Sequence, residues 1–335
     1  MEPIQKAAIA RASAALRIAT DNNGTAELAR AFVEGAKTML AADDGQAFPA
    51  LRLHANEAIR KSATPTFVLG NQAWGGGDAH ALAAGFIASI GQEDGLTALA
   101  KYARVFPGLI QYSLFASGFT ANAVGEGAPK AVVHPGLSGD DADAKKAASI
   151  IVCSTELARA SGDEAMRLFE AELRSGIVRG SNAALLSELS TATTTNVDAT
   201  GDALADLRAG LAKAQPSNGY VAFGPHAFTA DLATRSENTG GAGVRGGTFC
   251  TGVELVAVDD ATAVTIVPAS GIAMRDVGLT VRRAQHAMVQ MDSAPDNPTT
   301  ATTKMLSLWQ NGLVALLAER DFRIALGNTE IVKVS

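Results

Sequence analysis

The sequence predicts an α+β fold in which one long helix packs against long strands. Apolar residues recur at helical spacing over residues 161–189, and the tail alternates between two faces over residues 308–324. Residues 123–157 form a long, small-residue and weakly apolar stretch that cannot fold on itself. We therefore expect something outside this subunit to cover that stretch.

Length and composition limit the architecture and the classes of partner. The chain has 335 residues, which predicts about two compact units at roughly 100 to 200 residues each. Its 47% hydrophobic content suffices for a core, while only 5% aromatic residues indicates fine-grained packing. The net charge of -6 and the absence of any basic run longer than a doublet disfavour tight binding to phosphate backbones. Any contact with nucleic acid is expected to be weak and diffuse.

The two cysteines and the N-terminus indicate the compartment. Cys153 and Cys250 lie in or beside apolar runs, so we expect small buried thiols in a reducing environment. The first residues lack the charged and apolar regions of a secretory signal. No window reaches the roughly 18 consecutive apolar residues of a membrane span. We expect a protein that is made and kept in a cytoplasm, without a membrane.

The first hundred residues are predicted to be mostly helical. Residues 1–60 show helical spacing with a break at 21–24, which indicates an N-terminal extension separate from the main body. A short extended piece at 64–69 precedes Gly75–Gly76–Gly77, where we place a domain boundary. Helices are then predicted over 78–90 and 96–103.

A projecting finger is predicted next. Residues 109–120 read as a strand, and a second extended arm of similar length follows Glu126. At about 3.3 Å per residue, the pair makes a finger of roughly 30 to 40 Å. An isolated two-stranded hairpin is only marginally stable in water.

The long helix has the clearest local signals. A buried strand is predicted at 150–152, and Ser161 with Glu164 matches the capping box that opens a helix. The helix should end near residue 189, at about 40 Å long for about 1.5 Å per residue. Favourable i,i+4 pairs, Asp163–Arg167 and Glu170–Arg174, lie on its polar face. Its apolar stripe comprises Leu168, Phe169, Leu173, Ile177, Ala184 and Leu185.

A compact α/β region and two long strands complete the chain. A Thr-rich loop at 191–195 leads into this region. Its predicted elements are a helix at 202–214, a strand at 220–223, a helix at 226–234, a glycine loop at 240–247, and strands near 253–258, 263–267 and 272–274. The two long strands, at 280–291 and 308–324, should pack against the long helix.

Searches for catalytic and ligand-binding patterns favour a protein without a chemical site. Residues 241–246 (GAGVRG) match G-x-G-x-x-G, but polar residues precede them and a strand pattern follows, so a surface loop is favoured over a dinucleotide site. The five histidines are scattered, and no nucleophile-elbow, Walker A or H-E-x-x-H pattern occurs. The acidic pairs at 43–44, 140–141 and 259–260 are expected in solvated turns. We expect no catalytic, cofactor-binding or metal-binding residues and no enzymatic activity; a nucleotide-dependent enzyme that uses residues 241–246 is the alternative.

Glu126 and Lys130 allow two interpretations. Glu126 stands between Gly125 and Gly127 on the finger and has no local partner in the sequence. It is either an ordinary exposed acid or one half of a salt bridge to a neighbouring subunit. Lys130 allows the same two interpretations.

Three segments resemble the major capsid proteins of tailed phages with the Hong Kong 97-type fold. Residues 124–130 (VGEGAPK) resemble the family's VGEG segment, and residues 146–157 (KAASIIVCSTEL) resemble the entry to its spine helix. Residues 308–320 (LWQNGLVALLAER) resemble its C-terminal strand. The resemblance covers about residues 75–335. The tryptophan often found before VGEG is missing, and Gly127 stands where cross-linking members carry lysine, so we expect no covalent cross-links.

The resemblance implies a domain layout and a set of contact residues. Residues 1–74 have no specific match; in the family, such a helical stretch acts as a scaffolding segment that a phage protease removes. The implied parts are an N-arm at 75–111, an extended E-loop at 112–139, a P-domain with the spine helix at 140–198, an A-domain at 199–277 and P-domain return strands at 278–335. The implied intersubunit contacts of the E-loop are Phe115, Phe119, Glu126 and Lys130, and the implied spine-helix packing residues are Leu168, Phe169, Leu173 and Ile177.

The resemblance also implies a function. Copies of the chain would assemble through hexamers and pentamers into the icosahedral head that encloses a phage genome, in the cytoplasm of a bacterial host. The implied partners are further copies, double-stranded DNA by weak non-specific contact, portal, prohead protease and decoration proteins, and no cofactor is implied. The alternative with the same fold is an encapsulin-like shell that houses an enzyme.

A charged substitution on the finger tests its role in assembly. If Phe119 contacts a neighbouring subunit, Phe119→Asp places a charge in an apolar contact and blocks assembly, while the subunit stays soluble. Size-exclusion chromatography and electron microscopy measure the outcome. Intact shells from this variant refute the role of the finger.

Overall fold

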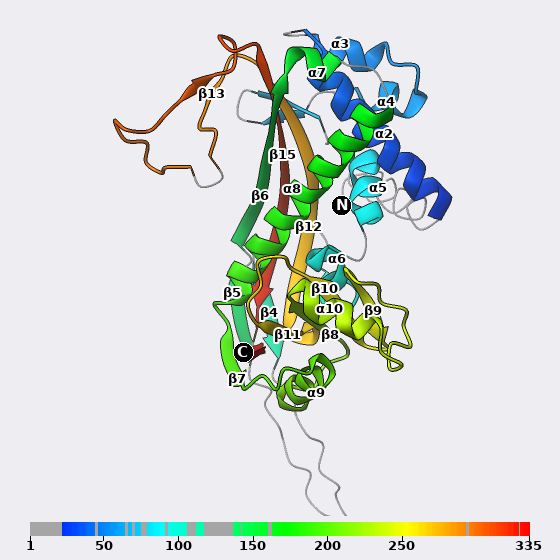
Figure 1. Cartoon of the computed structure of the whole chain (residues 1–335), viewed down its shortest axis with the longest axis vertical. Helices are drawn as coiled ribbons and strands as arrows, with labels where there is room; N and C mark the ends of the chain where they lie inside the picture. The colour runs from blue at the N-terminus through cyan, green and yellow to red at the C-terminus, as the bar shows by residue number, and fades with distance from the viewer. Residues whose placement is uncertain are drawn as a thin grey trace, which may run out of the picture. The chain divides into compact units, whose positions relative to one another are not determined.

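The computed structural model describes most of the chain in two compact units (Figure 1). The described residues are 22–43, 46–63, 66–68, 71–74, 79–90, 93–105, 112–116, 137–141, 143–159, 163–292, 295–327 and 329–335. Unit 1 is drawn from Met1–Ile90, Lys146–Gly180 and Gly278–Asp321, and unit 2 from Gly91–Lys145, Ser181–Val277 and Phe322–Ser335. The chain passes between the units several times, so neither unit is one continuous segment.

Unit 1 combines N-terminal helices with parts of long strands and of the longest helix. Its elements are α2 (Asn22–Ala41), α3 (Ala47–Arg52), α4 (Glu57–Ser62), the hairpin β1 (Thr66–Val68) and β2 (Asn71–Ala73), α5 (His80–Ile90), α7 (Thr155–Arg159) and most of α8 (Asp163–Leu189). The 27 residues of α8 agree with the predicted long helix, and Arg174 lies 3.2 Å from Glu170, which confirms that i,i+4 pair. The predicted capping residue Ser161 lies outside the described residues.

An aromatic cluster holds the N-terminal helices in the core of unit 1. Phe32 of α2 stacks on Trp74 at 5.1 Å between ring centroids, and it lies equally close to Phe86 of α5. The Trp74 backbone N–H donates to the Val281 carbonyl at 2.9 Å, and its ring Nε1–H donates to the Ser62 hydroxyl at 3.1 Å. The helices of residues 22–62 are therefore part of unit 1, because the apolar stripe of α2 is buried there. This differs from the predicted separate extension.

A four-stranded sheet contains the long strands. Its order is β3 (Arg104–Val105), β12 (Ile272–Ala284), β15 (Leu313–Leu326) and β6 (Asp143–Ser154). In Figure 1 the three long strands run side by side. The strands predicted at 272–274 and 280–291 form the single strand β12, followed by the short β13 (Met288–Val289), because pairing with β15 keeps the polar residues between them extended. Unit 1 packs part of α8 on this sheet, as predicted, through Leu173 and Ile177.

Unit 2 is built around a six-stranded mixed sheet. Its order is β7 (Thr193–Val197), β16 (Glu330–Val334), β11 (Val264–Pro268), β8 (Tyr220–Gly224), β10 (Val253–Ala257) and β9 (Gly246–Cys250). The accompanying helices are α6 (Gly95–Ala100), α9 (Ala203–Lys213) and α10 (His226–Ala233). The three helices and the strands β8, β10 and β11 lie close to their predicted positions. No strand was predicted at β16, and β9 begins within the predicted glycine loop. The Thr-rich segment predicted as a loop at 191–195 instead enters β7, because β-branched threonines suit a strand and β16 pairs with it in parallel.

The base of the predicted finger is a two-stranded ladder. β4 (Tyr112–Ala116) pairs antiparallel with β5 (Leu137–Asp141), from Tyr112↔Asp141 to Ala116↔Leu137. The carboxylates of Asp140 and Asp141 were expected in a turn, but these residues lie in β5 because they pair with β4. Residues 117–136, which include the predicted tip, lie outside the described residues.

Two helical glycines offer a matched test of the packing in unit 1. A Cβ added at Gly35 of α2 would lie 2.4 Å from the buried Trp74 ring, whereas one at Gly180 of α8 would lie 3.6 Å from the Ala147 Cβ. Gly35→Ala should lower the free energy of unfolding by about 1–3 kcal/mol through overpacking. Gly180→Ala should raise it by up to about 1 kcal/mol, because alanine favours a helix.

Urea unfolding of both variants measures these free energies. Equal effects of the two substitutions contradict the close contact between α2 and Trp74.

Candidate functional site

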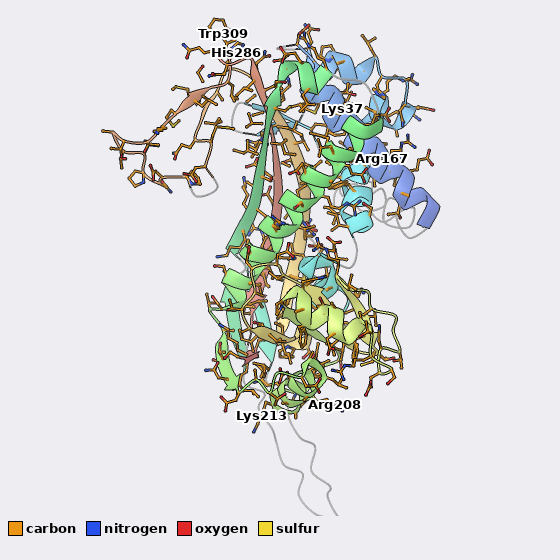
Figure 2. The ribbon with its side chains drawn as sticks, in the orientation of Figure 1. Lys37, Arg167, Arg208, Lys213, His286 and Trp309 are labelled. Carbon is orange, nitrogen blue, oxygen red and sulfur yellow. The ribbon has the colours of Figure 1, made fainter. Side chains whose placement is uncertain are left out.

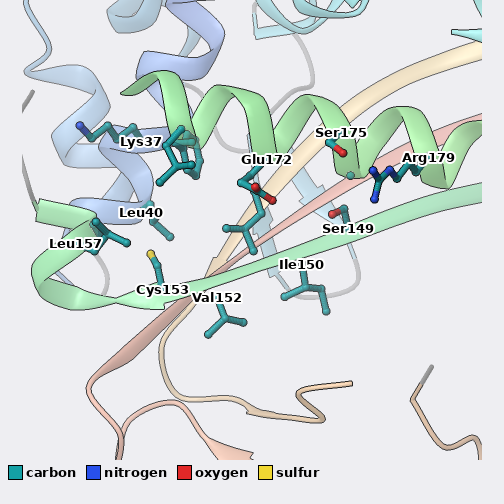
Figure 3. Close-up of a pocket in the computed structure, with 15 residues that line it drawn as sticks. Lys37, Leu40, Ser149, Ile150, Val152, Cys153, Leu157, Glu172, Ser175 and Arg179 are labelled. Atoms are coloured by element: carbon teal, nitrogen blue, oxygen red, sulfur yellow. The ribbon is translucent and has the colours of Figure 1, made fainter. Parts of the chain in front are cut away.

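A hollow in unit 1 lies between α8 and the edge strand β6 (Figure 3). Its volume is about 550 Å³. The floor comes from Ser149 to Cys153 of β6, one wall from α8, and the end from α2 and α7. Leu40, Leu157 and Leu168 contribute apolar surface to it. We call this feature the β6–α8 hollow.

Glycines of α8 allow the helix to approach β6 beside the hollow. A Cβ at Gly176 would lie 2.2 Å from the Ser149 hydroxyl, so the helix touches the strand there. A Cβ at Gly180, one turn further along α8, would lie 3.6 Å from the Ala147 Cβ, so the helix and the strand are also close there.

The predicted apolar stripe of α8 divides between the core and this hollow. Leu173 and Ile177 are buried in the core of unit 1, and Phe169 packs against it. Leu168 is 55% exposed and lines the hollow instead. The side chains at 169, 173 and 177 follow one i,i+4 row, and position 168 belongs to the adjacent row. The prediction that Leu168 packs in the core is therefore wrong.

β6 is less buried than its sequence predicted. Ile150 is 55% exposed and Val152 is half-buried, and both side chains point to the face of β6 opposite α8 (Figure 3). The thiols of Cys153 and Cys250 are free and half-buried rather than fully buried. Burial raises the pKa of the Cys153 thiol, so at neutral pH the unreactive protonated form dominates.

The rim of the hollow has charges of both signs. Lys37 comes from α2, whereas Glu172 and Arg179 come from α8 (Figure 3). Two basic groups and one acid give this rim a net charge of +1. An apolar floor with a weakly basic rim suits an apolar group with acidic neighbours.

A second polar cluster, at Glu319, is structural. The Glu319 carboxylate is buried and lies 3.1 Å from the Arg282 guanidinium and 3.3 Å from the Lys146 ammonium. Lys146 also lies 3.7 Å from Asp321. Charges of opposite sign are therefore matched, and they join β6, β12 and β15 within unit 1.

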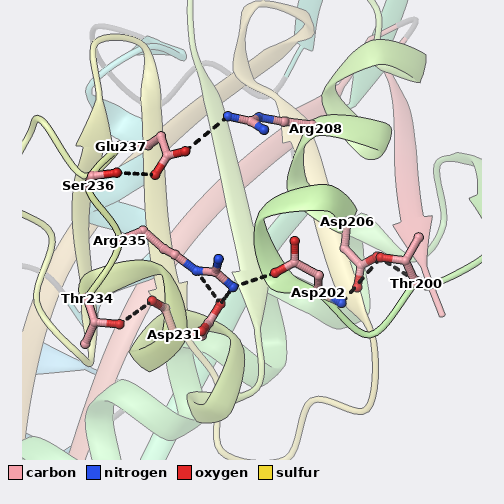
Figure 4. Close-up of polar contacts among 9 residues, drawn as sticks. All are labelled: Thr200, Asp202, Asp206, Arg208, Asp231, Thr234, Arg235, Ser236 and Glu237. Carbon is pink, nitrogen blue, oxygen red and sulfur yellow. Dashed lines mark hydrogen bonds and ion pairs between the residues drawn. The ribbon is translucent and has the colours of Figure 1, made fainter.

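Unit 2 contains a carboxylate cluster that is likewise satisfied (Figure 4). Arg235 donates to Asp231 of α10 at 2.9 Å and to Asp202 at 2.5 Å. Its hydrogen bond to Asp231 and the nearby acidic charges raise the pKa of Arg235. Asp206 accepts two hydrogen bonds of 2.7 Å from Thr200. These contacts join the N-terminal end of α9 to α10.

Glu254 is the buried acid of the sheet in unit 2. It accepts a hydrogen bond from Thr248 at 2.7 Å and lies 2.9 Å from the Lys101 ammonium. Burial, together with the Glu254 charge, raises the pKa of Tyr102. Through these contacts Glu254 connects the end of α6 with β9 and β10.

The remaining chemical candidates do not form sites among the described residues. Residues 241–246 follow α10 and lead into β9, so the strand–loop–helix order of a dinucleotide site is not found there. His54 lies 3.7 Å from Glu34 at the surface of unit 1. Within the described ranges, no group of His, Cys, Asp and Glu could hold a metal ion. In the same residues, no helix combines the length and apolarity needed to cross a membrane.

The predicted finger contacts remain predictions. Phe119, Glu126 and Lys130 lie outside the described residues. Phe115 lies in β4 opposite Ser138 in the ladder, and only its backbone is described.

An exposed apolar arm in unit 1 was not predicted from the sequence. Its described residues are 285–292 and 295–312, with the short strands β13 and β14 (Leu306–Ser307) paired within it. We call it the methionine arm. Its exposed apolar side chains are Met288, Met291, Met305 and Trp309. The sequence signal that could have revealed the arm is the mostly polar run of residues 292–304. The apolar residues on either side of this run do not follow the regular spacing of a core helix or strand.

Comparisons with known proteins give one local match and several distant structures. No family model matches the chain. The chain is 50% identical over 58 residues to the capsid polyprotein of Pseudomonas phage PAJU2, a match that covers 17% of this chain. It spans only 9% of the length of that relative.

The solved structures are similar at low identity. A chain from Mycobacterium phage Adephagia has a TM-score of 0.40 and 16% identity, covering 71% of this chain and 88% of that one. A chain from Gordonia phage Cozz has a TM-score of 0.42 and 14% identity, with 71% and 86% covered. A chain from the capsid of an empty GTA particle has a TM-score of 0.40 and 13% identity, with 71% and 89% covered.

The pH dependence of Cys153 alkylation tests the geometry of the hollow. In a Cys250→Ser variant, the rate of alkylation should rise with pH and level off at a higher pH than for a cysteine in an unfolded peptide, because burial raises the pKa. A time course of alkylation by maleimide or iodoacetamide, in matched buffers at each pH, measures the rate for the folded variant and for the unfolded peptide. A midpoint at or below that of the peptide contradicts a thiol shielded by the hollow.

Proposed function

We propose that this chain is a structural major capsid protein of a tailed phage or prophage, which assembles into the icosahedral head that encloses the genome. The observation that carries the proposal is the local identity of 50% to a phage capsid polyprotein. The segments resembling the Hong Kong 97-type family support the same class of protein, and they extend over a larger part of the chain.

Exposed apolar surface in unit 1 supports self-assembly. Leu157 and Leu168 are at least half exposed around the hollow, and Ile150 is 55% exposed on the opposite face of β6. Trp309 is 65% exposed on the methionine arm. Soluble monomers rarely leave large contiguous apolar patches in water. Further copies of the chain would cover these surfaces in a shell.

The finger would supply another contact between copies. β4 and β5 pair at its base, and the chain between them would extend over the adjacent subunit as an E-loop. Phe115 and Phe119 would lie in apolar contact with that subunit, and Glu126 and Lys130 would form salt bridges to it. Contacts of this head-to-tail kind generate rings when the rotation closes, which gives hexamers and pentamers.

The buried aromatic cluster bears on the fate of the N-terminal region. Phe32 and Trp74 are both fully buried in unit 1, where they stack on each other. Removal of residues 1–74 would take both rings out of that core. We therefore propose that at least residues 22–74 stay in the mature subunit rather than act as a cleaved scaffolding segment.

The remaining partners follow from charge and from the proposed class. A net charge of -6 without a dense basic run favours weak, non-specific contact with packaged DNA. Portal, prohead protease and decoration proteins would contact the assembled shell, in the host cytoplasm and then in the virion. The subunit would have no enzymatic role.

Particle formation by the purified chain tests the proposal. Expressed alone in a bacterial host and concentrated, the chain should form closed shells or rings of five and six copies. Sedimentation velocity and negative-stain electron microscopy measure this. A compact monomer at high concentration, with residues 112–139 against its own body, contradicts the proposal.

The content of the particles separates the two shell functions. Shells that enclose a co-expressed enzyme through a dedicated docking segment would favour an encapsulin-like compartment instead.

A further inference from the structure

We propose that the methionine arm of one copy inserts into the β6–α8 hollow of a second copy. The inference rests on the proposed shell function, and it adds a specific pair of surfaces. The predicted E-loop contact involves neither the methionine arm nor the β6–α8 hollow. The insertion would join two different surfaces of the same chain.

The methionine arm is held together by its own hydrogen bonds, and it exposes apolar side chains. Its strands pair at Met288↔Ser307, and Gln290 accepts a hydrogen bond from the Asp296 N–H at 2.8 Å. Thr303 donates to the Asp296 carboxylate at 2.6 Å. A segment that already holds its own shape loses little entropy when it binds.

The base of the methionine arm is fixed to unit 1. Leu308 is fully buried, and the Thr155 hydroxyl donates to the Gly312 carbonyl at 2.7 Å. Trp309 and His286 lie near the place where the arm leaves the sheet (Figure 2).

The exposed side chains of the arm are of the kind that anchor interfaces. Trp309 is 65% exposed, and Met288, Met291 and Met305 are exposed with it. Tryptophan is enriched among the residues that dominate binding energy. Methionine side chains adapt to irregular apolar surfaces.

The hollow has the size and lining to receive such side chains. About 550 Å³ lies within the range of roughly 300–1,000 Å³ that buries drug-sized groups. Leu157 and Leu168 leave apolar surface exposed there. Burial of these groups against methionine and tryptophan removes apolar surface from water on both partners.

Charge favours the same pairing. The arm has Asp292, Asp296 and Lys304 among residues 285–312, a net charge of -1. The rim of the hollow has Lys37, Glu172 and Arg179, a net charge of +1. Opposite net charges steer the two surfaces together and disfavour arm-to-arm contact.

No described residue of the arm lines the hollow of its own chain, so insertion of the arm requires a second copy. The two surfaces are complementary to each other and are not the same patch. A contact of this kind is head-to-tail and closes into a ring when the rotation permits. This is the type of contact that the proposed hexamers and pentamers need.

A directed cross-link between two chains tests the contact. The hollow partner keeps Cys153 and has Cys250→Ser. The arm partner has Cys153→Ser, Cys250→Ser and Met305→Cys, and it is first loaded at position 305 with a bifunctional maleimide, from which excess reagent is removed. The two chains, with tags of different size, are then mixed under assembly conditions.

The control uses the same arm partner with a different acceptor. That acceptor has Cys153→Ser, Cys250→Ser and Leu53→Cys, and Leu53 is 87% exposed in unit 1 away from the hollow. Random collisions favour this control, because its thiol is the more accessible. We expect at least tenfold more covalent heterodimer with Cys153 than with the control, with the linked peptides identified by mass spectrometry.

The outcomes separate the contact from the shell function. Shells without an excess of the Cys153 cross-link overturn the contact and leave the proposed function standing. The cross-link without shells supports the contact and overturns the proposed function. Absence of both overturns both.

Discussion

Apolar surface that one copy leaves in water is the constraint on which the rest of this structure depends. β6 is an edge strand with Ile150 exposed, and α8 turns Leu168 away from the core that holds Leu173. The methionine arm exposes Trp309 on the same unit. In the proposed shell, association of copies would remove this surface from water, so the fold and the assembly would be linked through one interaction.

Local sequence signals predicted the elements whose determinants lie close together in the chain. The Glu170–Arg174 pair and the apolar row of α8 are both visible within a few residues, and the helix follows them. β7 could not be predicted in this way, because its Thr-rich sequence has no apolar run and its partner β16 lies at the far end of the chain. Position 168 was assigned to the wrong face, since adjacent helical rows differ by a single residue.

The candidate site was less predictable than the fold. The β6–α8 hollow depends on a close approach at Gly176, which no periodic pattern reports. The methionine arm has no regular spacing, so its apolar residues look isolated in the sequence. The core position of Trp74 likewise appears only when α2, α5 and β12 come together. Each of these features arises from contacts between segments distant in the chain.

Oxidative footprinting of the methionines tests most directly whether identical copies cover the exposed surface. Met288, Met291 and Met305 are exposed in the subunit, while Met39 and Met274 are buried and serve as internal references. Hydroxyl-radical oxidation, quantified by mass spectrometry across a concentration series, should fall at least tenfold for the three arm methionines as copies associate. Unchanged oxidation of the arm at every concentration, in a chain that stays monomeric, contradicts the account.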